Sequence, residues 1–297
     1  MAETKKADEL WTIGKILEWT KNFFDGKGIE NPRLDAEVLL ASVLGQSRMY
    51  LYVHYDQPLN AEELGIFRGL VKRRAQREPV AYLLERREFF GHTFKVTPAV
   101  LVPQPDTEIL VEHALAGLKE MAEQGGQERL RIADIGTGSG AIILSLLASL
   151  PQAEGIAVDI SPEALAVAGE NAAALEVGER VEFRNGDLCA PLQGELLDAI
   201  VSNPPYIPHD AIPTLAPEVR HEPHLALDGG LDGLDFYRRL VEDAPAYVRS
   251  GGFLALEIGA GEAPAVLALA EKNPAWGQGR SLKDLAGLDR VIILERK

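Results

Sequence analysis

The chain has 297 residues, of which 46% are hydrophobic and 25% charged, and its formal net charge is −15. This composition is typical of a globular protein with one or two domains. The negative charge argues against nonspecific nucleic-acid binding, which requires Lys and Arg to neutralise phosphates. No apolar stretch approaches the ~20 residues of a membrane span, and the first residues lack the apolar segment of a signal peptide.

Cysteine and histidine usage narrows the chemistry further. The single cysteine, Cys189, excludes an internal disulfide framework and favours a reducing cytoplasm, so we expect a cytoplasmic protein. Cys189 is expected to be a small buried filler rather than a nucleophile. Six scattered histidines without cysteine partners lack metal-site spacing, and the sequence therefore predicts no metal site.

Residues 1–85 are predicted to form a small helical bundle whose surface, rather than a pocket, is functional. Apolar residues recur there at helical spacing in three stretches. These residues are Ile13, Ile16, Leu17 and Phe24, then Ala36, Leu39, Leu40, Val43 and Leu44, then Leu64, Phe67, Leu70 and Val71. A basic stretch at 72–77, near Arg86 and Arg87, indicates either a solvated helix face or a contact surface for an acidic partner.

Residues 86–105 are predicted to be a β-hairpin connector between two domains. Short strands at 88–90 and 93–96 would flank a tight turn at Gly91-His92. Three prolines follow this hairpin, after which Asp106 or Thr107 is expected to cap a helix.

Residues 106–297 are predicted to form the second domain, in which strands and helices alternate. The predicted strands are 130–135, 155–159, 181–184, 196–201, 252–258 and 290–294, and the predicted helices are 141–150, 162–176, 236–248 and 263–271. This alternation is typical of an α/β fold with a doubly wound, mainly parallel sheet. Such sheets bind ligands beyond the carboxyl ends of their strands.

A glycine-rich loop of sequence DIGTGSG follows the first of these strands. The residues predicted to bind a cofactor there are Asp134, Gly136, Thr137, Gly138, Ser139 and Gly140. The glycines allow the backbone to bend and a ligand to approach without Cβ clashes. The spacing G-x-G-x-G, preceded by an acid within the strand, favours S-adenosylmethionine over a nicotinamide cofactor, whose fingerprint is G-x-G-x-x-G.

Three further residues at predicted strand ends complete the expected cofactor site. Asp159 can accept hydrogen bonds from ribose hydroxyls. Asp187 either accepts from the adenine amino group or is only a turn residue, and Leu188 can pack on the adenine face. Asp134 has the alternative role of capping a helix or bracing the loop.

The sequence Asn203-Pro204-Pro205-Tyr206 follows the strand predicted at 196–201. A planar NH2 group has its lone pair in conjugation, so its attack on a methyl carbon requires a fixed orientation. Asn203 offers a side-chain carbonyl, and Pro204 a backbone carbonyl without a competing N–H. The prolines stiffen the turn, Tyr206 can stack on the acceptor, and Asn203 is also expected to contact the donor.

A Pro-Pro pair after a strand is often only a loop breaker. Behind a strand and downstream of a glycine loop, however, the motif favours methyl transfer to a planar nitrogen. The chain resembles, almost end to end, the bacterial protein-(glutamine-N5) methyltransferases of peptide chain release factors, called PrmC or HemK. The shared motifs are Glu78-Pro-Val-Ala81, Arg87-Glu-Phe89, Pro103-Gln-Pro-Asp-Thr-Glu108, Asp134–Gly140, Ser202-Asn-Pro-Pro-Tyr206, Glu218-Val-Arg-His-Glu-Pro223, Gly233-Leu-Asp-Phe-Tyr237 and Asp284-Leu-Ala-Gly-Leu-Asp-Arg290.

This resemblance implies a Rossmann-like class I S-adenosylmethionine-dependent methyltransferase with a helical N-terminal domain that docks release factors. The substrate would be the glutamine amide of a Gly-Gly-Gln motif, and the products N5-methylglutamine and S-adenosylhomocysteine. The partners would then be release factors in translation termination. We expect neither direct nucleic-acid binding nor membrane binding, and we expect a monomer.

The resemblance also implies roles for single residues. Its donor-binding positions are Gly136, Gly138, Gly140 and Asp159, and its acceptor-binding positions are Asn203, Pro204, Tyr206, Phe89 and Phe90. The chain departs from the family at Gln104, where arginine is usual, and at His221, where phenylalanine is usual. The first departure puts a charge contact at the connector in doubt, and the second concerns a wall of the acceptor site.

Two other functions fit parts of the sequence. The same Asn-Pro-Pro-Tyr chemistry serves enzymes that methylate the amino group of a flipped base in DNA or RNA. The acidic net charge argues against that alternative. The other alternative is a noncatalytic interaction protein that keeps the fold, and the intact glycine loop and Asn203 argue against it.

Overall fold

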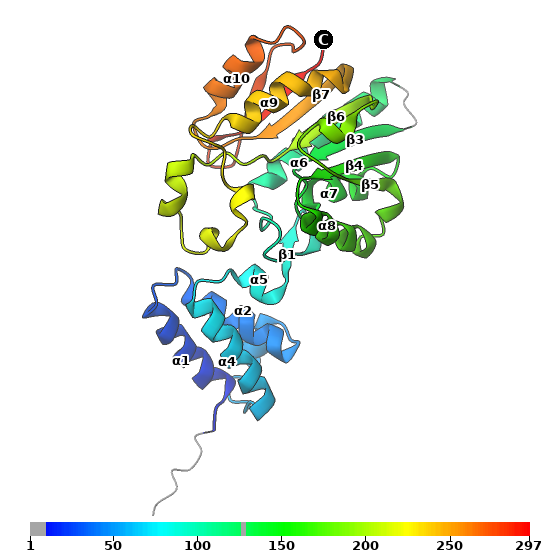
Figure 1. Cartoon of the computed structure of the whole chain (residues 1–297). Coiled ribbons are helices and arrows are strands. Elements are labelled where there is room, and N and C mark those ends of the chain that lie inside the picture. The colour runs from blue at the N-terminus through cyan, green and yellow to red at the C-terminus, as the bar shows by residue number, and fades with distance from the viewer. Residues whose placement is uncertain (1–9, 126–128) are drawn as a thin grey trace, which may run out of the picture. The chain divides into compact units, whose positions relative to one another are not determined.

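The computed structural model describes residues 10–125 and 129–297. The chain forms two compact units, one that ends at Glu85 and one that runs from Arg86 to Lys297 (Figure 1). Each unit has a hydrophobic core of its own. Within the described residues, no helix combines the length and the apolar character needed to cross a membrane.

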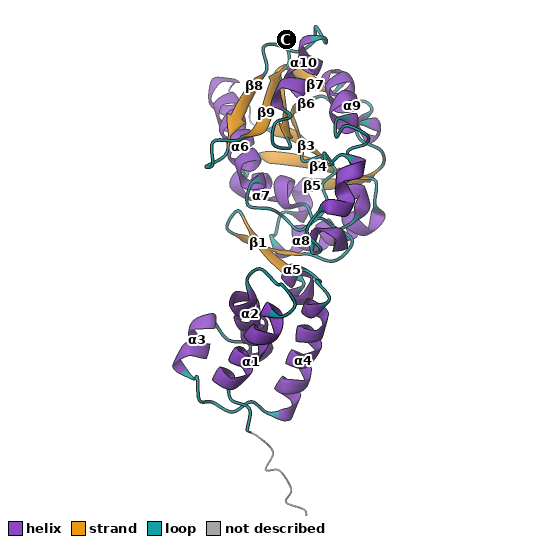
Figure 2. Ribbon diagram, turned by 90° about the vertical axis from the view of Figure 1, so that its left-hand side faces the viewer, coloured by secondary structure: helices purple, strands orange, loops and turns teal. Residues whose placement is uncertain are grey.

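The N-terminal unit is helical, as its apolar periodicity predicts (Figure 2). Its helices are α1 (Ile13–Asp25), α2 (Pro32–Leu44), α3 (Arg48–Val53), α4 (Ala61–Ala75) and α5 (Val80–Leu84). Helix α2 begins with a proline at its first position, where the missing N–H costs nothing. Helix α4 begins with a capping box between Asn60 and Glu63. The short helices α3 and α5 were not predicted, because so few residues show no clear period.

The basic stretch of the N-terminal unit is engaged within that unit. Arg73 Nε donates to Glu78 Oε2 at 2.8 Å, and Arg74 Nε donates to Asp35 Oδ2 at the same distance. Arg74 is almost fully buried. Part of this stretch therefore stabilises the bundle instead of forming a free contact surface.

The second unit begins with a hairpin of β1 (Arg86–Phe89) and β2 (His92–Lys95). Phe89 pairs with His92, so the turn is at Phe90 and Gly91, one residue before the predicted turn. Both turn residues have positive φ, 49° and 76°, as a two-residue type I′ turn requires. The turn was predicted one residue too late because only one of its two positive φ angles falls on a glycine; the other is at Phe90.

The remaining elements form a seven-stranded sheet with helices on both faces. They are α6 (Thr107–Gly125), β3 (Leu130–Ile135), α7 (Ala141–Ser149), β4 (Ala153–Asp159), α8 (Pro162–Ala174), β5 (Val181–Asn185), β6 (Leu197–Ser202), α9 (Asp235–Asp243), β7 (Val248–Glu257), α10 (Ala263–Glu271), β8 (Arg280–Lys283) and β9 (Asp289–Glu295). The strand order is β5-β4-β3-β6-β7-β9-β8. The five neighbouring strands β5, β4, β3, β6 and β7 are parallel, whereas β9 is antiparallel to β7 and β8. The predicted doubly wound, mainly parallel fold is confirmed.

The two faces of the sheet have separate cores, because successive side chains of a strand point to opposite faces. Leu130 and Ile132 of β3 pack with α6 and α7, whereas Ala133 and Ile135 pack with α9 and α10 (Figure 1). This arrangement leaves the carboxyl ends of the strands free to form a site.

Two predictions about elements were wrong in detail. The helix predicted at 236–248 ends at Asp243, since Pro245 lacks the N–H that would continue it. Val248 instead begins strand β7. Strand β8 was missed because its sequence, RSLK, has no apolar alternation and forms the edge of the sheet.

Candidate active site

The candidate site lies where the strand order reverses. Strand β3 pairs with β4 on one side and with β6 on the other. Ile135 of β3 and Ser202 of β6 are register partners, so Gly136 and Asn203 leave the sheet next to each other. Such a switch point is where open α/β sheets bind their ligands.

A cavity of about 410 Å³ opens at this edge of the sheet. Ten predicted site residues line it, namely Gly136, Thr137, Gly138, Ser139, Asp159, Asp187, Leu188, Asn203, Pro204 and Pro205. Other parts of the wall come from neighbours of these residues, from residues of 99–107 and 223–226, and from Phe236. The fold therefore joins the predicted donor loop and the predicted acceptor turn in one cavity.

The glycine loop has the backbone that close approach of a ligand requires. Gly136 and Gly138 have φ angles of 73° and 56°, and a Cβ at either position would have no atom within 4 Å. The cavity side of both glycines is thus open to a ligand. Gly140 differs, because a Cβ there would meet Leu144 Cδ1 at 2.8 Å. It is absent from the cavity wall and packs closely at the start of α7, and its predicted donor contact stays a prediction.

Asp134 braces the glycine loop and does not line the cavity. It is fully buried, and its Oδ2 accepts a 2.7 Å hydrogen bond from the Thr137 hydroxyl. Burial raises the pKa of Asp134 to about 7, against the effect of that hydrogen bond. Of its two predicted roles, the bracing role fits this geometry.

Asp159 is held in a fixed orientation at the cavity wall. Its Oδ2 accepts from the Gly138 N–H at 2.8 Å, and its Oδ1 accepts from the Ser161 N–H at 2.9 Å. Each carboxylate oxygen has a second lone pair with which to accept from a ribose hydroxyl. The acid is therefore preorganised by the loop that it helps to shape.

Asp187 and Leu188 also line the cavity, at the end of β5. Asp187 Oδ2 accepts from Arg239 Nη2 at 2.6 Å, and about half of the Asp187 side chain is exposed. Leu188 has a positive φ of 47°, which is uncommon for a leucine. A strained backbone that directs an apolar side chain to a cavity fits packing against a flat ligand.

Asn203 is oriented by a buried polar chain that the sequence did not reveal. Its Nδ2 donates to Thr107 Oγ1 at 3.1 Å. Glu257, at the end of β7, is 2% exposed. Burial raises its pKa to about 7, while hydrogen bonds from Thr107 and Asn203 oppose that rise. Since the hydrogen bond to Thr107 uses the amide nitrogen of Asn203, its Oδ1 is left to accept from a ligand.

Two sequence features could have revealed this chain. Thr107 belongs to the segment Pro103–Glu108, in which only a capping role was considered for it. Glu257 is an acid at the carboxyl end of a buried strand, which is where ligand-binding residues of such sheets lie.

Three residues predicted to enclose the acceptor are not part of the cavity wall. Phe89 is 1% exposed and packs in the core with Phe94, at 6.0 Å between ring centroids. Phe90 packs against that core, and its N–H donates to Glu108. Tyr206 packs against the other core, and burial raises its pKa. These aromatic rings support the site from behind.

The segment after the Asn-Pro-Pro-Tyr turn returns to the cavity at Pro223. Glu222, just before it, is buried, and its Oε2 accepts from the Val102 N–H at 2.8 Å. Burial raises the pKa of Glu222 to about 7. Gln104 lines the cavity and donates to the Val102 carbonyl, so it supplies a neutral contact where the family usually has a charge. His221 is exposed and does not line the cavity.

The prediction for the cysteine is confirmed, whereas the prediction for the histidines is not. Cys189 is buried as predicted, and burial raises its thiol pKa to about 12, which removes it as a nucleophile. The expectation that the histidines are scattered was wrong for two of them. His209 and His224 lie beside Asp228, far enough apart in sequence that spacing did not reveal the cluster.

Comparisons with known proteins show the family to which the chain belongs. Residues 15–84 match the family described as PrmC N-terminal domain, and residues 107–220 match the methyltransferase small domain. The chain is 47% identical over 285 residues to the release factor glutamine methyltransferase of Geobacter sulfurreducens, with 96% of each chain covered. It is 48% identical over 270 residues to that of Moorella thermoacetica, with 91% of this chain and 93% of the relative covered.

Solved structures share the fold at low identity. The N-terminal domain of human METTL16 in complex with SAH has a TM-score of 0.52 at 16% identity, over 75% of this chain and 83% of that one. A methyltransferase from Pyrococcus furiosus has a TM-score of 0.50 at 18% identity, over 75% of this chain and 98% of that one. These likenesses show a Rossmann-like methyltransferase fold.

Proposed function

We propose, since the chain belongs to the release factor glutamine methyltransferase family, that it methylates the glutamine amide nitrogen in the Gly-Gly-Gln motif of peptide chain release factors. The observation that carries this proposal is the placement of Asn203 in the cavity, with its amide nitrogen bonded to the Thr107 hydroxyl. A cytoplasmic role in translation termination belongs to the same proposal.

The donor half of the cavity fits S-adenosylmethionine. Gly136 and Gly138 present open backbone, and Asp159 presents oriented carboxylate oxygens for a ribose. Leu188 and Asp187 would contact the adenine, the first by packing and the second by accepting a hydrogen bond. S-adenosylmethionine supplies a methyl group on a positively charged sulfur, and S-adenosylhomocysteine is the product.

The acceptor half orients the glutamine amide. Asn203 Oδ1 and the Pro204 carbonyl would accept its two N–H groups, which aims the nitrogen lone pair out of the amide plane. Positioning of this kind can supply several kcal/mol of the barrier. Because the acceptors are held in place before the substrate arrives, little reorganisation is needed during reaction. The new N–C bond makes the nitrogen acidic, so its proton leaves readily without a strong base.

The N-terminal unit would dock the release factor through its surface. Helix α3 exposes Met49 and Val53, whose exposed fractions are 69% and 71%. Large apolar side chains at a surface favour contact with another protein. We therefore assign substrate docking to residues 1–85 and methyl transfer to the α/β domain that follows the connector at 86–105.

A labelled methyl-transfer assay tests the substrate class. Purified protein is incubated with methyl-labelled S-adenosylmethionine and either a release factor, DNA or RNA, at low and high salt. We expect label on the release factor at both salt concentrations, because recognition does not depend on phosphate neutralisation. Label on nucleic acid alone would overturn the proposal.

A further inference from the structure

Residues 208–226 form a long loop, called the excursion here, directly after the Asn-Pro-Pro-Tyr turn. The two ends of this loop meet at a neck formed by Ile207 and residues 227–229. The Ile207 N–H donates to the Leu227 carbonyl at 3.0 Å, and the Gly229 N–H donates to the Ile207 carbonyl at 2.8 Å. Ile207 and Asp228 thereby form a parallel bridge. Side chains next to this bridge are brought together although about twenty residues separate them along the chain.

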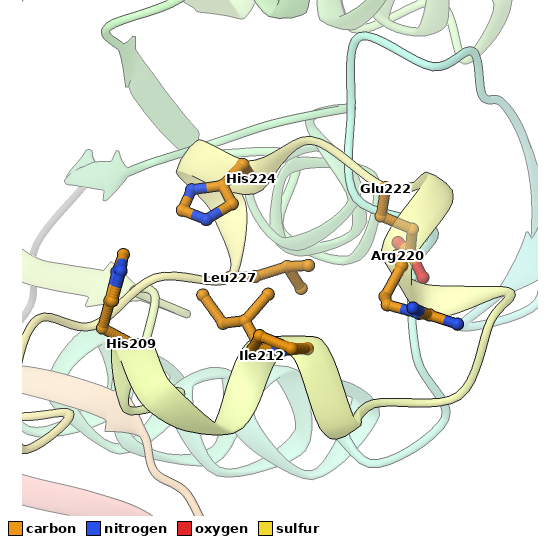
Figure 3. Close-up of a pocket in the computed structure, with 7 residues that line it drawn as sticks. His209, Ile212, Arg220, Glu222, His224 and Leu227 are labelled. Carbon is orange, nitrogen blue, oxygen red and sulfur yellow. The ribbon is translucent and has the colours of Figure 1, made fainter.

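Two histidines and one aspartate meet at this neck. His209 begins the 3-10 helix η3 (His209–Thr214), and His224 begins η5 (His224–Ala226). Figure 3 shows the two imidazoles at one end of a small pocket, with Arg220 and Glu222 at the other end. Both imidazoles are more than half exposed, so solvent ions can reach them.

The aspartate carboxylate is already oriented toward both rings. Asp228 Oδ1 accepts from the Gly230 N–H at 3.0 Å. Its Oδ2 lies 2.8 Å from His209 Nδ1 and 3.8 Å from His224 Nδ1. One ligand atom from each of the three residues can be chosen so that all lie within 4.8 Å of one another. Backbone support of a carboxylate is what well-formed metal sites provide.

We propose that His209, His224 and Asp228 bind a divalent transition-metal ion. Two imidazole nitrogens and one carboxylate oxygen suit Zn²⁺, Ni²⁺ or Co²⁺, whereas Ca²⁺ and Mg²⁺ prefer oxygen ligands alone. Bonds of about 2.0–2.2 Å to Zn²⁺ place its ligands roughly 3–3.5 Å apart. The distances of 2.8 and 3.8 Å from Asp228 Oδ2 to the two imidazole nitrogens bracket that spacing.

The competing arrangement is a plain hydrogen bond between His209 and Asp228, which uses the same atoms. That bond leaves His224 as a bystander, because its Nδ1 is 3.8 Å from the carboxylate. The metal site instead requires His209 and His224 equally. This difference separates the two arrangements experimentally.

The ion would act on the wall of the main cavity. His224 lines the small pocket, while its neighbours Pro223 and Leu225 line the large one. A cation that ties His224 to the neck would therefore fix this wall from behind. The consequence, which rests on the proposed function, is a lower KM for the release factor in the presence of the ion.

Calorimetric titration of Zn²⁺ into the full, untagged, chelator-treated chain tests the site directly. His209→Gln and His224→Gln each remove one ligand, and His221→Gln is the matched control, an exposed histidine of the same segment. We expect one ion per wild-type and control chain. Either ligand variant should bind at least about tenfold more weakly, since loss of a supporting partner alone costs about that much.

Absence of binding to the wild type, or equal binding by all four proteins, would overturn the site. Loss with His209→Gln but not with His224→Gln would also overturn the three-residue site, since His224 would then not be a ligand. Because these readouts use no substrate, they stand even if the proposed methyl acceptor is wrong. If the ion binds but the KM for release factor is unchanged, only the proposed effect on the wall is contradicted.

Discussion

Buried carboxylates are treated differently in the two units of the chain. In the helical unit, Glu37 is 1% exposed, and its carboxylate accepts from Arg33, Arg48 and Tyr52 at 2.6–2.8 Å. Burial raises the pKa of Glu37, but these hydrogen bonds outweigh burial and hold the pKa below its usual value. This carboxylate stays charged and ties helices together.

Three buried carboxyls beside the cavity of the α/β unit show the opposite balance. Asp134, Glu222 and Glu257 are buried, and burial raises the pKa of each to about 7. Each one accepts from a group that shapes the cavity, namely Thr137, the Val102 N–H, and Thr107 with Asn203. Perturbed carboxyls of this kind gather at functional sites. The first unit thus uses a buried charge for stability, whereas the second uses buried carboxyls to position the groups of its cavity.

The largest expected effect comes from the residue that the buried carboxyls position. Asn203→Ala should lower turnover by about 10²–10³-fold, the usual cost of removing one oriented hydrogen-bonding group from an active site. Affinity for S-adenosylmethionine should change little, because the glycine loop and Asp159 remain. Single-turnover kinetics and donor titration measure the two quantities separately.

The control is Asn273→Ala, which removes an amide that donates to the Val241 carbonyl outside the cavity. Its turnover should equal that of the wild type. If Asn203→Ala weakened donor binding as much as turnover, the positioning role would be lost.

A substitution in the helical unit should affect stability instead. Glu37→Gln leaves Arg33 and Arg48 without their charged partner, so the free energy of unfolding of the bundle should fall by about 1–3 kcal/mol. Donor binding in the other unit should be unaffected. Chemical denaturation of the full chain, with exposed Glu62→Gln as the control, measures the difference. An unchanged unfolding curve would contradict the stabilising role of Glu37.

A smaller effect on turnover is expected from Thr107, the residue that holds the side chain of Asn203. Thr107→Val removes the hydroxyl that links Asn203 to Glu257 while keeping the shape of the side chain. Turnover should fall about tenfold, the equivalent of one hydrogen bond of roughly 1.4 kcal/mol. Thr93→Val, which removes an exposed hydroxyl bonded to Glu88, is the matched control. Equal activity of the two variants would show that the polar chain does not orient Asn203.

The last expected effect is on the pH dependence of stability and leaves turnover aside. The pKa of Glu222 is raised from 4.5 to about 7 in the folded state. Its folded form thus favours the proton, and the stability that it contributes is full below about pH 4.5 and lost as pH rises through 7. Glu222→Gln should therefore remove a slope of about 1 kcal/mol per pH unit between these values.

Denaturation curves recorded at several pH values report this slope. Exposed Glu179→Gln serves as the control and should keep the slope of the wild type. A Glu222→Gln variant with the same slope as the wild type would show that this buried carboxyl does not exchange its proton on unfolding.

Local patterns were sufficient to predict most of the fold. Buried strands such as β3 and β6 are rich in apolar residues, and Pro32 and Pro162 mark helix starts that the structure keeps. Edge strand β8 and the end of α9 were missed, because burial is partial at the edge and one proline decides where the helix stops.

The sequence predicted those site residues whose contact with a ligand depends on backbone conformation at the end of a strand. Gly136 and Gly138 lie on the cavity because they end a strand at the switch point of the sheet. Thr107 and Glu257 could not be found in this way, since their contacts join elements about 150 residues apart in the chain. The same holds for His209 and His224, which only the return of the excursion brings together.

Mass spectrometry of a release factor after incubation with the protein and S-adenosylmethionine tests the central claim most directly. We predict one added methyl group, located on the side-chain amide of the glutamine in the Gly-Gly-Gln motif. A release factor with that glutamine replaced by alanine should gain none. A methyl group on any other residue, or an equal gain by the alanine variant, would contradict the assignment.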